Sequence, residues 1–271
     1  MTNNIVFSIV ISAFNRAHCI ERAINSARDF LANELCSEIV VVDDGSSDNT
    51  VSTVEKIIAS MNAGPAIFLI KHNINKGVCA AKNTGANAAR GKWLIFLDSD
   101  DELIANSYPG LCSAIERYSL CPIHFFSCST EGEVQEMHLT VQVNFDQYIR
   151  SGTLGEKLPV IKKSIFSLHP YDEDMPGYEG LSYMRIIRKH GCACIHGLSV
   201  RRYYTSNQDR LSSRAALFKR SGRLAIGHLR VISEHHAVMT LRGILMYGLR
   251  CIKSAALWGF WRLFLKQNSF N

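Results

Sequence analysis

The sequence predicts an α/β protein: a mostly parallel, Rossmann-type sheet flanked by helices, with a helical extension on its C-terminal side. Three observations lead to this prediction. Short apolar runs alternate with helix-like segments over the first hundred residues, as in βαβ units with right-handed crossovers. Two of these runs end in carboxylates, and open α/β sheets bind ligands at the carboxyl ends of their strands. Residues 211–266 show helical periodicity.

Strands are expected where apolar residues follow one another, and helices where they recur every three or four positions. The expected strands are 7–11, 38–42, 66–70, 92–97, 123–128 and 192–200. The expected helices are 19–35, one beginning at 48 or 49, 78–89, one beginning near 106, and 179–190. A turn is expected at 130–135, and no element is assigned to 141–160.

Local signals justify these boundaries. Asp48 or Asn49 can cap the second helix, and Gly64-Pro65 breaks the chain before the third strand. The helix at 78–89 is built of small residues and is followed by Gly91. The apolar face of the first helix is formed by Ile20, Ala23, Ile24, Ala27 and Leu31.

The size and cysteine content indicate one large domain in a reducing compartment. The chain has 271 residues, 47% of them apolar, and we expect a domain over 1–210 and an extension over 211–271. Its nine cysteines are odd in number and scattered, which is typical of free, mostly buried thiols. Cys192 and Cys194 form the only close pair. They lack a second pair at zinc-finger spacing, so we expect them to pack in the core.

The charge is unevenly distributed. Residues 1–199 carry a net charge of −5, whereas 200–271 carry 13 Lys/Arg and two acids. Such a basic tail indicates an anionic partner, either nucleic acid or the cytoplasmic leaflet of a membrane. The run 5–11 has no basic region before it and is too short for a signal peptide. No stretch reaches the roughly 18 apolar residues of a spanning helix.

The tail itself resembles an interfacial helix. In a helix over 240–266, basic side chains gather on one face beside a broad apolar surface that includes Trp258 and Trp261. Tryptophan next to basic residues suits a membrane interface. The alternative is a helix that packs on the catalytic domain and has an ordinary solvated face. The basic residues are Arg242, Arg250 and Lys253.

The most informative motif is the acidic cluster after the apolar run 93–97. Asp98 and Asp100 are two positions apart, so at a strand end their carboxylates can converge on one divalent cation. Mg²⁺ or Mn²⁺ held by a few carboxylates and by substrate phosphates is the usual form of such a site. The cluster therefore suggests a metal-bridged diphosphate. In the alternative interpretation it is a solvated loop, and Asp101-Glu102 cap the next helix.

Four segments of the chain resemble the family 2 inverting glycosyltransferases, which share the A-type (GT-A) nucleotide-sugar-binding fold. They occur in the family's order and spacing, and they cover about residues 5–105. A fifth, weaker match follows at 171–191. The four segments are 8–16, 39–48, 75–92 and 96–101. The resemblance identifies 1–210 as a GT-A-like catalytic domain and leaves 211–271 as a basic amphipathic extension.

The resemblance implies a nucleoside pocket at the ends of the first two strands. Asp43 or Asp44 would accept the base N–H of uracil; the alternative is turn chemistry, since Asp-Gly-Ser favours turns by itself. The pocket residues implied after the first strand are Ser12, Phe14, Asn15 and Arg16.

The resemblance also implies residues that hold the diphosphate. Asp98 and Asp100 match the family's metal motif, and Asp98 and Ser99 are expected to contact the substrate. Lys82 occupies a position beside the diphosphate where the family often has arginine. Lysine keeps the positive charge, but it lacks the planar guanidinium with which arginine can bind a phosphate through two hydrogen bonds. The alternative for Lys82 is a solvated helix residue.

The general base is expected at Glu179. The family has a Glu-Asp pair at the start of a helix here, but this chain reads Glu179-Gly180, so the second acid is missing. An inverting enzyme needs a carboxylate that takes the proton of the acceptor hydroxyl. Asp172 and Asp174 are the reserve candidates. The alternative for Glu179 is a first-turn acid that the helix dipole favours.

Further residues are expected near the diphosphate. Arg202 and Arg210 lie where family members place a loop that closes over the substrate, and either would bring positive charge to the leaving group. His196 is a candidate third metal ligand. Each of these residues has a packed or solvated position as its alternative.

Together these features predict a metal-dependent inverting glycosyltransferase. By resemblance, it moves a sugar from a nucleotide-sugar, expected to be a UDP-sugar, to a hydroxyl of a glycan in bacterial surface polysaccharide assembly (O-antigen, capsule, exopolysaccharide or lipopolysaccharide). The tail then favours a polyprenyl-diphosphate-linked acceptor and an anionic membrane surface rather than nucleic acid. The expected location is peripheral, on the cytoplasmic face of the cell membrane.

Two alternatives come from other classes of protein. A nucleotidyltransferase or dinucleotide enzyme would need a glycine-rich phosphate loop after the first strand, and 12–18 contains no glycine. A non-catalytic relative is favoured by the missing acid at Gly180 but not by the intact pair Asp98 and Asp100.

Overall fold

The computed structural model describes residues 7–32, 37–130, 136–152, 155–204 and 214–262. The chain forms two compact units. One comprises Met1–Pro176 and Ser182–Thr205, and the other comprises Gly177–Leu181 and Ser206–Asn271. The domain boundary predicted at 210 lies outside the described residues, and it stays a prediction.

The first unit is built on one twisted sheet with the order β3-β2-β1-β4-β8-β6-β9-β5, in which β7 also pairs with β9. Its first half is entirely parallel and contains the first four predicted strands. These strands are β1 (Phe7–Ala13), β2 (Glu38–Asp43), β3 (Ala66–Lys71) and β4 (Trp93–Asp98). The predicted α/β fold is confirmed.

The second half of the sheet is mixed. β8 runs antiparallel to both β4 and β6, whereas β6 and β9 are parallel. The short β5 and the longer β7 both pair antiparallel with β9. The strands are β5 (Glu102–Leu103), β6 (Ile123–Ser129), β7 (Glu136–Val143), β8 (Lys157–Lys162) and β9 (Ala193–Arg202).

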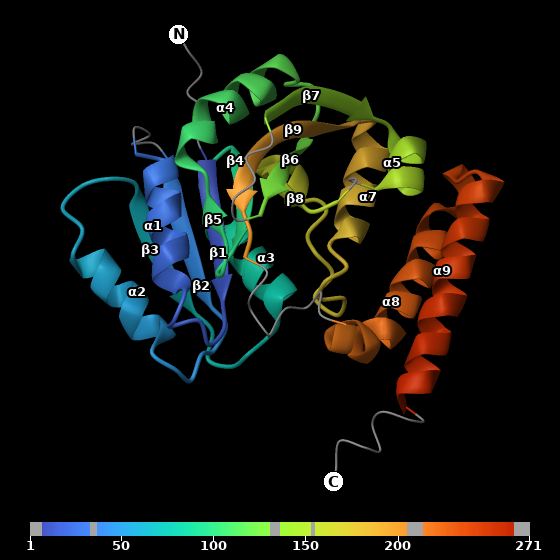
Figure 1. Cartoon of the computed structure of the whole chain (residues 1–271), viewed down its shortest axis with the longest axis horizontal. Helices are drawn as coiled ribbons and strands as arrows, with labels where there is room; N and C mark the ends of the chain where they lie inside the picture. The colour runs from blue at the N-terminus through green and yellow to red at the C-terminus, as the bar shows by residue number, and fades with distance from the viewer. Residues whose placement is uncertain (1–6, 33–36, 131–135, 153–154, 205–213, 263–271) are drawn as a thin grey trace. The chain divides into compact units, whose positions relative to one another are not determined.

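The helices of the first unit cover both faces of the parallel strands (Figure 1). One face holds the main core, where α1 buries the predicted residues Ile20, Ala23, Ile24 and Ala27. On the other face of the sheet, α3 packs against Val40 and Val42. The helices are α1 (Ile20–Phe30), α2 (Thr50–Ala59), α3 (Val78–Ala88), α4 (Tyr108–Arg117), α5 (Phe145–Ser151), α6 (Lys163–Phe166) and α7 (Gly180–His190), with a 3₁₀ turn at Ala105–Ser107.

A glycine lets α3 lie close to the sheet. A Cβ on Gly85 would stand 2.4 Å from Val10 Cγ1 and 3.1 Å from Val42 Cγ2, which is closer than packed carbon atoms approach. The close packing of this helix fixes the position of Lys82, one turn earlier on α3.

Two expectations for the first unit need correction or completion. Asp101 and Glu102 do not cap a helix: Glu102 begins β5, because the chain pairs with β9 before it turns into α4. The unassigned stretch 141–160 contains the end of β7, α5 and the start of β8. The turn expected at 130–135 lies outside the described residues except for Thr130.

The second unit is a pair of helices, α8 (Arg214–His235) and α9 (Leu241–Phe260), that pack along each other (Figure 1). The predicted helical character is confirmed, but the helix is interrupted at 236–240, where the Thr240 hydroxyl accepts a hydrogen bond from Gly243 N and caps α9. Within the described residues, no helix combines the length and the apolar character needed to cross a bilayer.

Candidate active site

The predicted site residues at the ends of β1, β2 and β4 meet at one edge of the sheet. Ser12 pairs in register with Asp98, and Ala13 pairs with Asp43. Because these strands are parallel, their carboxyl ends lie side by side. Asp43 and Asp98 are each the last residue of their strand, so strand pairing alone brings both carboxylates to this edge.

Asp98 lies between two cations. Its Oδ1 is 3.0 Å from Lys82 Nζ, and its Oδ2 is 3.5 Å from Arg201 Nη1. Burial raises the pKa of Asp98, but the charges of Lys82 and Arg201 outweigh this effect and hold the pKa below its ordinary value. Lys82 is buried and ion-paired, so it is not the solvated helix residue of the alternative interpretation.

Arg201 is a site residue that sequence reasoning missed. Its buried guanidinium contacts Asp98, Asp101 Oδ2 at 3.2 Å and Glu156 Oε2 at 3.4 Å. Burial lowers the pKa of Arg201, but Cys128, Asp101 and Asp98 raise it by more, and the group stays charged. The pairing of β9 with β6 shifts register twice before Cys128. The alternation of side chains between the two faces of a strand therefore does not predict which of Arg201 and Arg202 points inward.

Arg202, the residue named from the sequence, points elsewhere. Its Nη1 lies 3.4 Å from Glu102 Oε2, and the same carboxylate binds Arg22 Nε at 3.0 Å. The role predicted for Arg202 at the leaving group stays a prediction. Arg210 lies outside the described residues.

The acidic loop after β4 has a donor set that fits a hard divalent cation. Asp101 N donates to Asp98 O at 3.1 Å, which closes a tight turn around the buried Ser99. The Asp98 side chain is 43% exposed, and its two oxygens offer about four lone-pair positions, of which Lys82 and Arg201 take two. Oxygen ligands from Asp98 and Asp100 would suit Mg²⁺ or Mn²⁺.

The two acids at the end of β2 have different environments. Asp44 is fully engaged: Oδ1 accepts from Lys76 N at 2.9 Å and lies 2.7 Å from His72 Nδ1, and Oδ2 accepts from Gly77 N at 2.8 Å. It anchors the loop that leads into α3. Asp43 Oδ2 accepts from Ser46 N at 3.0 Å, which is the turn chemistry of the alternative interpretation.

Asp43 nevertheless keeps one oxygen for another partner. Its Oδ1 is buried and has no hydrogen-bond partner among the residues that the structure describes. An unsatisfied buried carboxylate oxygen costs about 1–3 kcal/mol, so such an atom points to a ligand donor. Between the two acids named from the sequence, Asp43 is therefore the open acceptor.

The loop after β1 completes this end of the site. Asn15 is the one non-glycine residue with a positive φ in the described ranges, at 54°. Its Oδ1 accepts from Ser47 N at 2.9 Å, and its N donates to Ser46 Oγ at 2.8 Å, so the loops after β1 and β2 are joined. Phe14 is exposed beside it, and Arg16 N donates to Thr50 Oγ1 at 2.7 Å.

Glu179 belongs to the second unit and immediately precedes α7, one residue from the predicted helix start. Its neighbour Tyr178 is held by α8: the Tyr178 hydroxyl lies 2.6 Å from His228 Nδ1, and a Cβ on Gly227 would meet the Tyr178 ring at 2.8 Å. Of the reserve acids, Asp172 is ion-paired with Arg185 at 2.9 Å, and Asp174 is exposed.

The expectation that His196 is a third metal ligand beside Asp98 is wrong. His196 Nδ1 lies 3.0 Å from Thr140 Oγ1, and Nε2 lies 3.0 Å from His124 Nδ1. His196 therefore lies near the start of β9, five residues before Arg201, and not at the carboxyl edge of the sheet where Asp98 lies.

Comparisons with known proteins identify relatives of this chain. The family model described as Glycosyl transferase family 2 matches residues 8–167. The GalNAc(5)-diNAcBac-PP-undecaprenol beta-1,3-glucosyltransferase of Campylobacter jejuni is 27% identical over 232 residues, which are 82% of this chain and 71% of the relative. The UDP-Glc:alpha-D-GlcNAc-diphosphoundecaprenol beta-1,3-glucosyltransferase WfaP of Escherichia coli is 36% identical over 94 residues, or 35% of each chain. The succinoglycan biosynthesis protein ExoO of Rhizobium meliloti is 44% identical over 95 residues, or 35% of this chain and 25% of that one.

Solved structures show the same fold. S. aureus TarS 1-349 in complex with UDP-GlcNAc matches with a TM-score of 0.66 and 14% identity, over 95% of this chain and 73% of that one. The mannosyltransferase PcManGT from Pyrobaculum calidifontis, in complex with GDP-Man and Mn²⁺, matches with a TM-score of 0.66 and 18% identity, over 95% and 75%. The family model covers more than half of the sequence. The chain therefore belongs to glycosyl transferase family 2, and it is a glycosyltransferase.

Proposed function

We propose that this protein is a metal-dependent inverting glycosyltransferase that uses a UDP-sugar and extends a lipid-linked glycan of the bacterial surface. The observation that carries the proposal is the arrangement at the end of β4, where Asp98 lies between Lys82 and Arg201 and is followed by Asp100. Positive charge stabilises a departing diphosphate. This edge of the sheet has two fixed cationic side chains, Lys82 and Arg201, and carboxylates that could bind a metal ion as a third cation.

The donor end of the site supports a uracil nucleotide. The open Oδ1 of Asp43 is a buried acceptor, and the uracil ring carries an N–H that would donate to it. Two of the matched proteins point the same way: WfaP is named for UDP-Glc, and TarS was solved with UDP-GlcNAc. PcManGT was solved with GDP-Man, so the fold by itself does not select uracil.

The residues would divide the chemistry as follows. Asp98 and Asp100 would hold Mg²⁺ or Mn²⁺, which supplies Lewis-acid assistance to the departing nucleoside diphosphate. Lys82 and Arg201 keep Asp98 ionised and add charge at the same edge. Glu179 would take the proton of the acceptor hydroxyl as its oxygen bonds to the anomeric carbon. The bond from that carbon to the diphosphate oxygen breaks on the opposite side, and the configuration inverts.

The acceptor is proposed to be a polyprenyl-diphosphate-linked glycan. The Campylobacter and Escherichia relatives are both named for undecaprenol-linked diphosphate substrates. Such an acceptor lies at a membrane, and helix α9 offers a surface that suits one. Leu241, Leu245 and Leu249 are 72, 59 and 68% exposed, so this face of α9 is not an ordinary solvated one.

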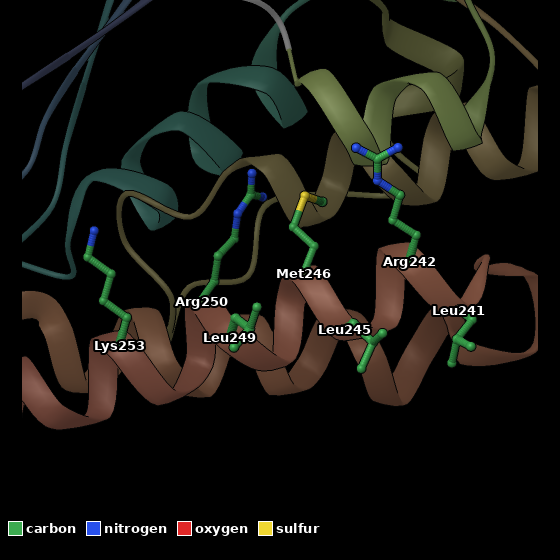
Figure 2. A pocket seen from close by; sticks show the side chains of 7 residues that line it. All are labelled: Leu241, Arg242, Leu245, Met246, Leu249, Arg250 and Lys253. Atoms are coloured by element: carbon green, nitrogen blue, oxygen red, sulfur yellow. The ribbon is translucent and has the colours of Figure 1, made fainter.

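Basic side chains lie beside these leucines. Arg242, Arg250 and Lys253 extend from α9 on one side of the leucine row in Figure 2, and all three are exposed. An apolar row flanked by cations is the pattern of a helix that lies in the interface of an anionic membrane. We therefore place the protein on the cytoplasmic face of the cell membrane, as a peripheral protein.

A donor and acceptor assay tests the function. The purified protein is incubated with Mn²⁺, a panel of UDP- and GDP-sugars and a synthetic polyprenyl-diphosphate-linked saccharide, and released nucleotide and product linkage are measured. We expect release of UDP that depends on the acceptor and on the metal, with an inverted anomeric product. Asp98→Asn should abolish transfer, whereas Asp29→Asn, which changes an exposed acid on α1, should leave it intact. Retention of configuration, or full transfer by Asp98→Asn, would overturn the proposal.

A further inference from the structure

A second cluster of potential ligands lies at the opposite end of the sheet from Asp98. His124 is near the start of β6, and Cys194 and His196 are near the start of β9. One ligand atom from each of these three lies within 4.8 Å of the other two, and all three residues are buried. Among the described residues, no other group of three histidine, cysteine or acidic side chains meets this criterion.

The hydrogen bonds around the two histidines fix their protonation. His124 Nε2 lies 3.1 Å from the Cys121 carbonyl oxygen, which only accepts, so the proton of the neutral ring is on Nε2 and Nδ1 carries a lone pair. That Nδ1 lies 3.0 Å from His196 Nε2. The Thr140 hydroxyl lies 3.0 Å from His196 Nδ1. A carbonyl or hydroxyl on the distal nitrogen is the usual orienting contact of a metal-binding histidine.

Both rings are neutral, as metal binding requires. Burial, reinforced for His124 by the neighbouring ring, lowers the pKa of His124 to about 3. Burial lowers the pKa of His196 to about 4. His124 Nδ1 and His196 Nε2 face each other, and a single proton lies between them. A metal ion that replaced this proton would bind both nitrogens.

Two further cysteines lie near this group. The carbonyl oxygen of Cys121 accepts from His124 Nε2, and the Cys121 thiol interacts with the thiols of Cys194 and Cys192. The Cys121 thiol lies outside the group of three, so it would have to turn inward to join them. Cys192 is partly exposed. In sequence the donors read Cys121-X-X-His124 and Cys192-X-Cys194-X-His196. In the fold, the segment with Cys192 and Cys194 at the start of β9 lies beside Cys121-X-X-His124 at the start of β6.

We propose that His124 Nδ1, His196 Nε2 and Cys194 Sγ bind a zinc ion that clamps the start of β6 to β9, with the Cys121 thiol turning inward as the fourth ligand. Two histidines and two cysteines form a common closed structural zinc set. The separation of 3.0 Å between the two nitrogens is close to the roughly 3.3 Å that tetrahedral geometry gives for Zn–N bonds of about 2.0–2.1 Å.

The proton balance of binding follows from these contacts. Cys121 and Cys194 each release one proton to solvent and bind as thiolates. The proton on His196 Nε2 is replaced by one on Nδ1, where the Thr140 oxygen accepts it, so the histidine charge does not change. No redox step is involved. The metal would lie away from the carboxyl edge of the sheet, and it would not compete with a cation on Asp98 and Asp100.

Cobalt substitution tests the site without measuring activity. The reduced full-length protein is stripped with a chelator and titrated with Co²⁺, and then Zn²⁺ is added. We expect one equivalent of Co²⁺ with a thiolate charge-transfer band and intense tetrahedral ligand-field bands, all displaced by Zn²⁺. Cys194→Ser and His124→Gln should abolish the bands. Cys251→Ser, which removes a thiol elsewhere, and Asp98→Asn, which removes the diphosphate-side ligand, should retain them.

A milder variant keeps the test decisive if the ligand variants fail to fold. Thr140→Val leaves all four ligands in place but removes the contact on His196 Nδ1, and it should weaken Zn²⁺ affinity about 10–100-fold in competition with a chelator. Absence of thiolate bands in the folded wild-type protein would show a hydrogen-bonded core cluster only and would overturn the proposal. Unchanged bands in folded Cys194→Ser would do the same.

Discussion

Lys82 Nζ lies 3.0 Å from Asp98 Oδ1, and this ion pair joins helix α3 to the end of β4. Both partners come from elements whose positions are fixed by packing: α3 lies against Val10 and Val42 through Gly85, and β4 lies between β1 and β8. The lysine therefore reaches the proposed diphosphate site from a rigid base, and its charge is present before any substrate arrives. Such preorganised charge is what lowers the barrier for an anionic leaving group.

We expect Lys82→Met, which keeps the length of the side chain but removes the charge, to lower kcat/KM by about 10²–10³-fold, the effect of losing one preorganised donor in other enzymes. Lys82→Arg should retain much more activity, because the charge remains. Steady-state kinetics with the natural donor measures both, and circular dichroism checks folding. Equal activity of the Met variant and the wild type would show that Lys82 serves only to hold Asp98.

The two acids at the end of β2 should respond differently to the same substitution. Asp43→Asn places an amide donor where the uracil N–H would donate, and we expect KM for a UDP-sugar to rise about 10–100-fold with little change in Tm. Asp44→Asn should lower Tm, because it weakens three contacts that hold the loop before α3. Titration calorimetry with UDP and thermal unfolding separate the effects. The reverse pattern would assign base recognition to Asp44.

Glu179→Gln should lower kcat by about 10²–10⁴-fold while UDP binding is unchanged, as expected for loss of a general base. Asp172→Asn is the matched control: it removes an acid in the same stretch of chain, but one held by Arg185. His228→Phe should lower kcat more modestly, because His228 binds the hydroxyl of Tyr178, the residue before Glu179. Transfer at the wild-type rate by Glu179→Gln would place the base elsewhere.

Acid should destabilise the protein well before its carboxylates titrate. Burial lowers the pKa of His124 to about 3 and of His196 to about 4, against about 6.5 in an unfolded chain. Between these values the unfolded state binds more protons, so the free energy of unfolding falls as pH falls from about 6.5 towards 4 and is fully recovered above 6.5. His228, whose pKa is lowered by burial to about 4, adds to the same slope.

We expect Tm, measured with a chelator present, to fall over that range in the wild type and less steeply in His196→Gln. The exposed His236→Gln is the control and should follow the wild-type curve. Parallel curves for wild type and His196→Gln would contradict the prediction, because they would mean that the folded protein takes up a proton on His196 as readily as the unfolded chain does.

The parallel half of the sheet was predictable because each strand is an apolar run and each helix has a clear periodic face. The mixed half was predictable only in part: β6 and β9 match the strands expected at 123–128 and 192–200, whereas β5, β7 and β8 were not predicted. β8 contains Pro159, which lowers its strand signal, and β5 has only two residues, whose pairing with β9 no local pattern predicts. Arg201 was not predicted as a site residue, because two register shifts in the pairing of β9 with β6 decide whether Arg201 or Arg202 points inward.

Contacts between residues far apart in the chain were also not predictable from the sequence. His124 and His196 are 72 residues apart, and only the parallel pairing of β6 and β9 brings them together. In contrast, the acids at the ends of β2 and β4 were found because parallel strands end at one edge whatever the details of packing. The sequence named both Asp43 and Asp44 as candidates, but only hydrogen-bond partners distinguish them.

The exposed face of α9 predicts binding to anionic membranes. The protein should float with liposomes that contain phosphatidylglycerol and not with neutral phosphatidylcholine liposomes, and binding should weaken as salt rises, because the Debye length shrinks. Leu245→Ser with Leu249→Ser should reduce flotation by removing apolar area, at little cost in stability, since both side chains are exposed. Leu120→Ser removes an even more exposed leucine from the first unit and is the control. If the double variant still floats like the wild type, or if neutral liposomes bind equally well, α9 is not the membrane contact.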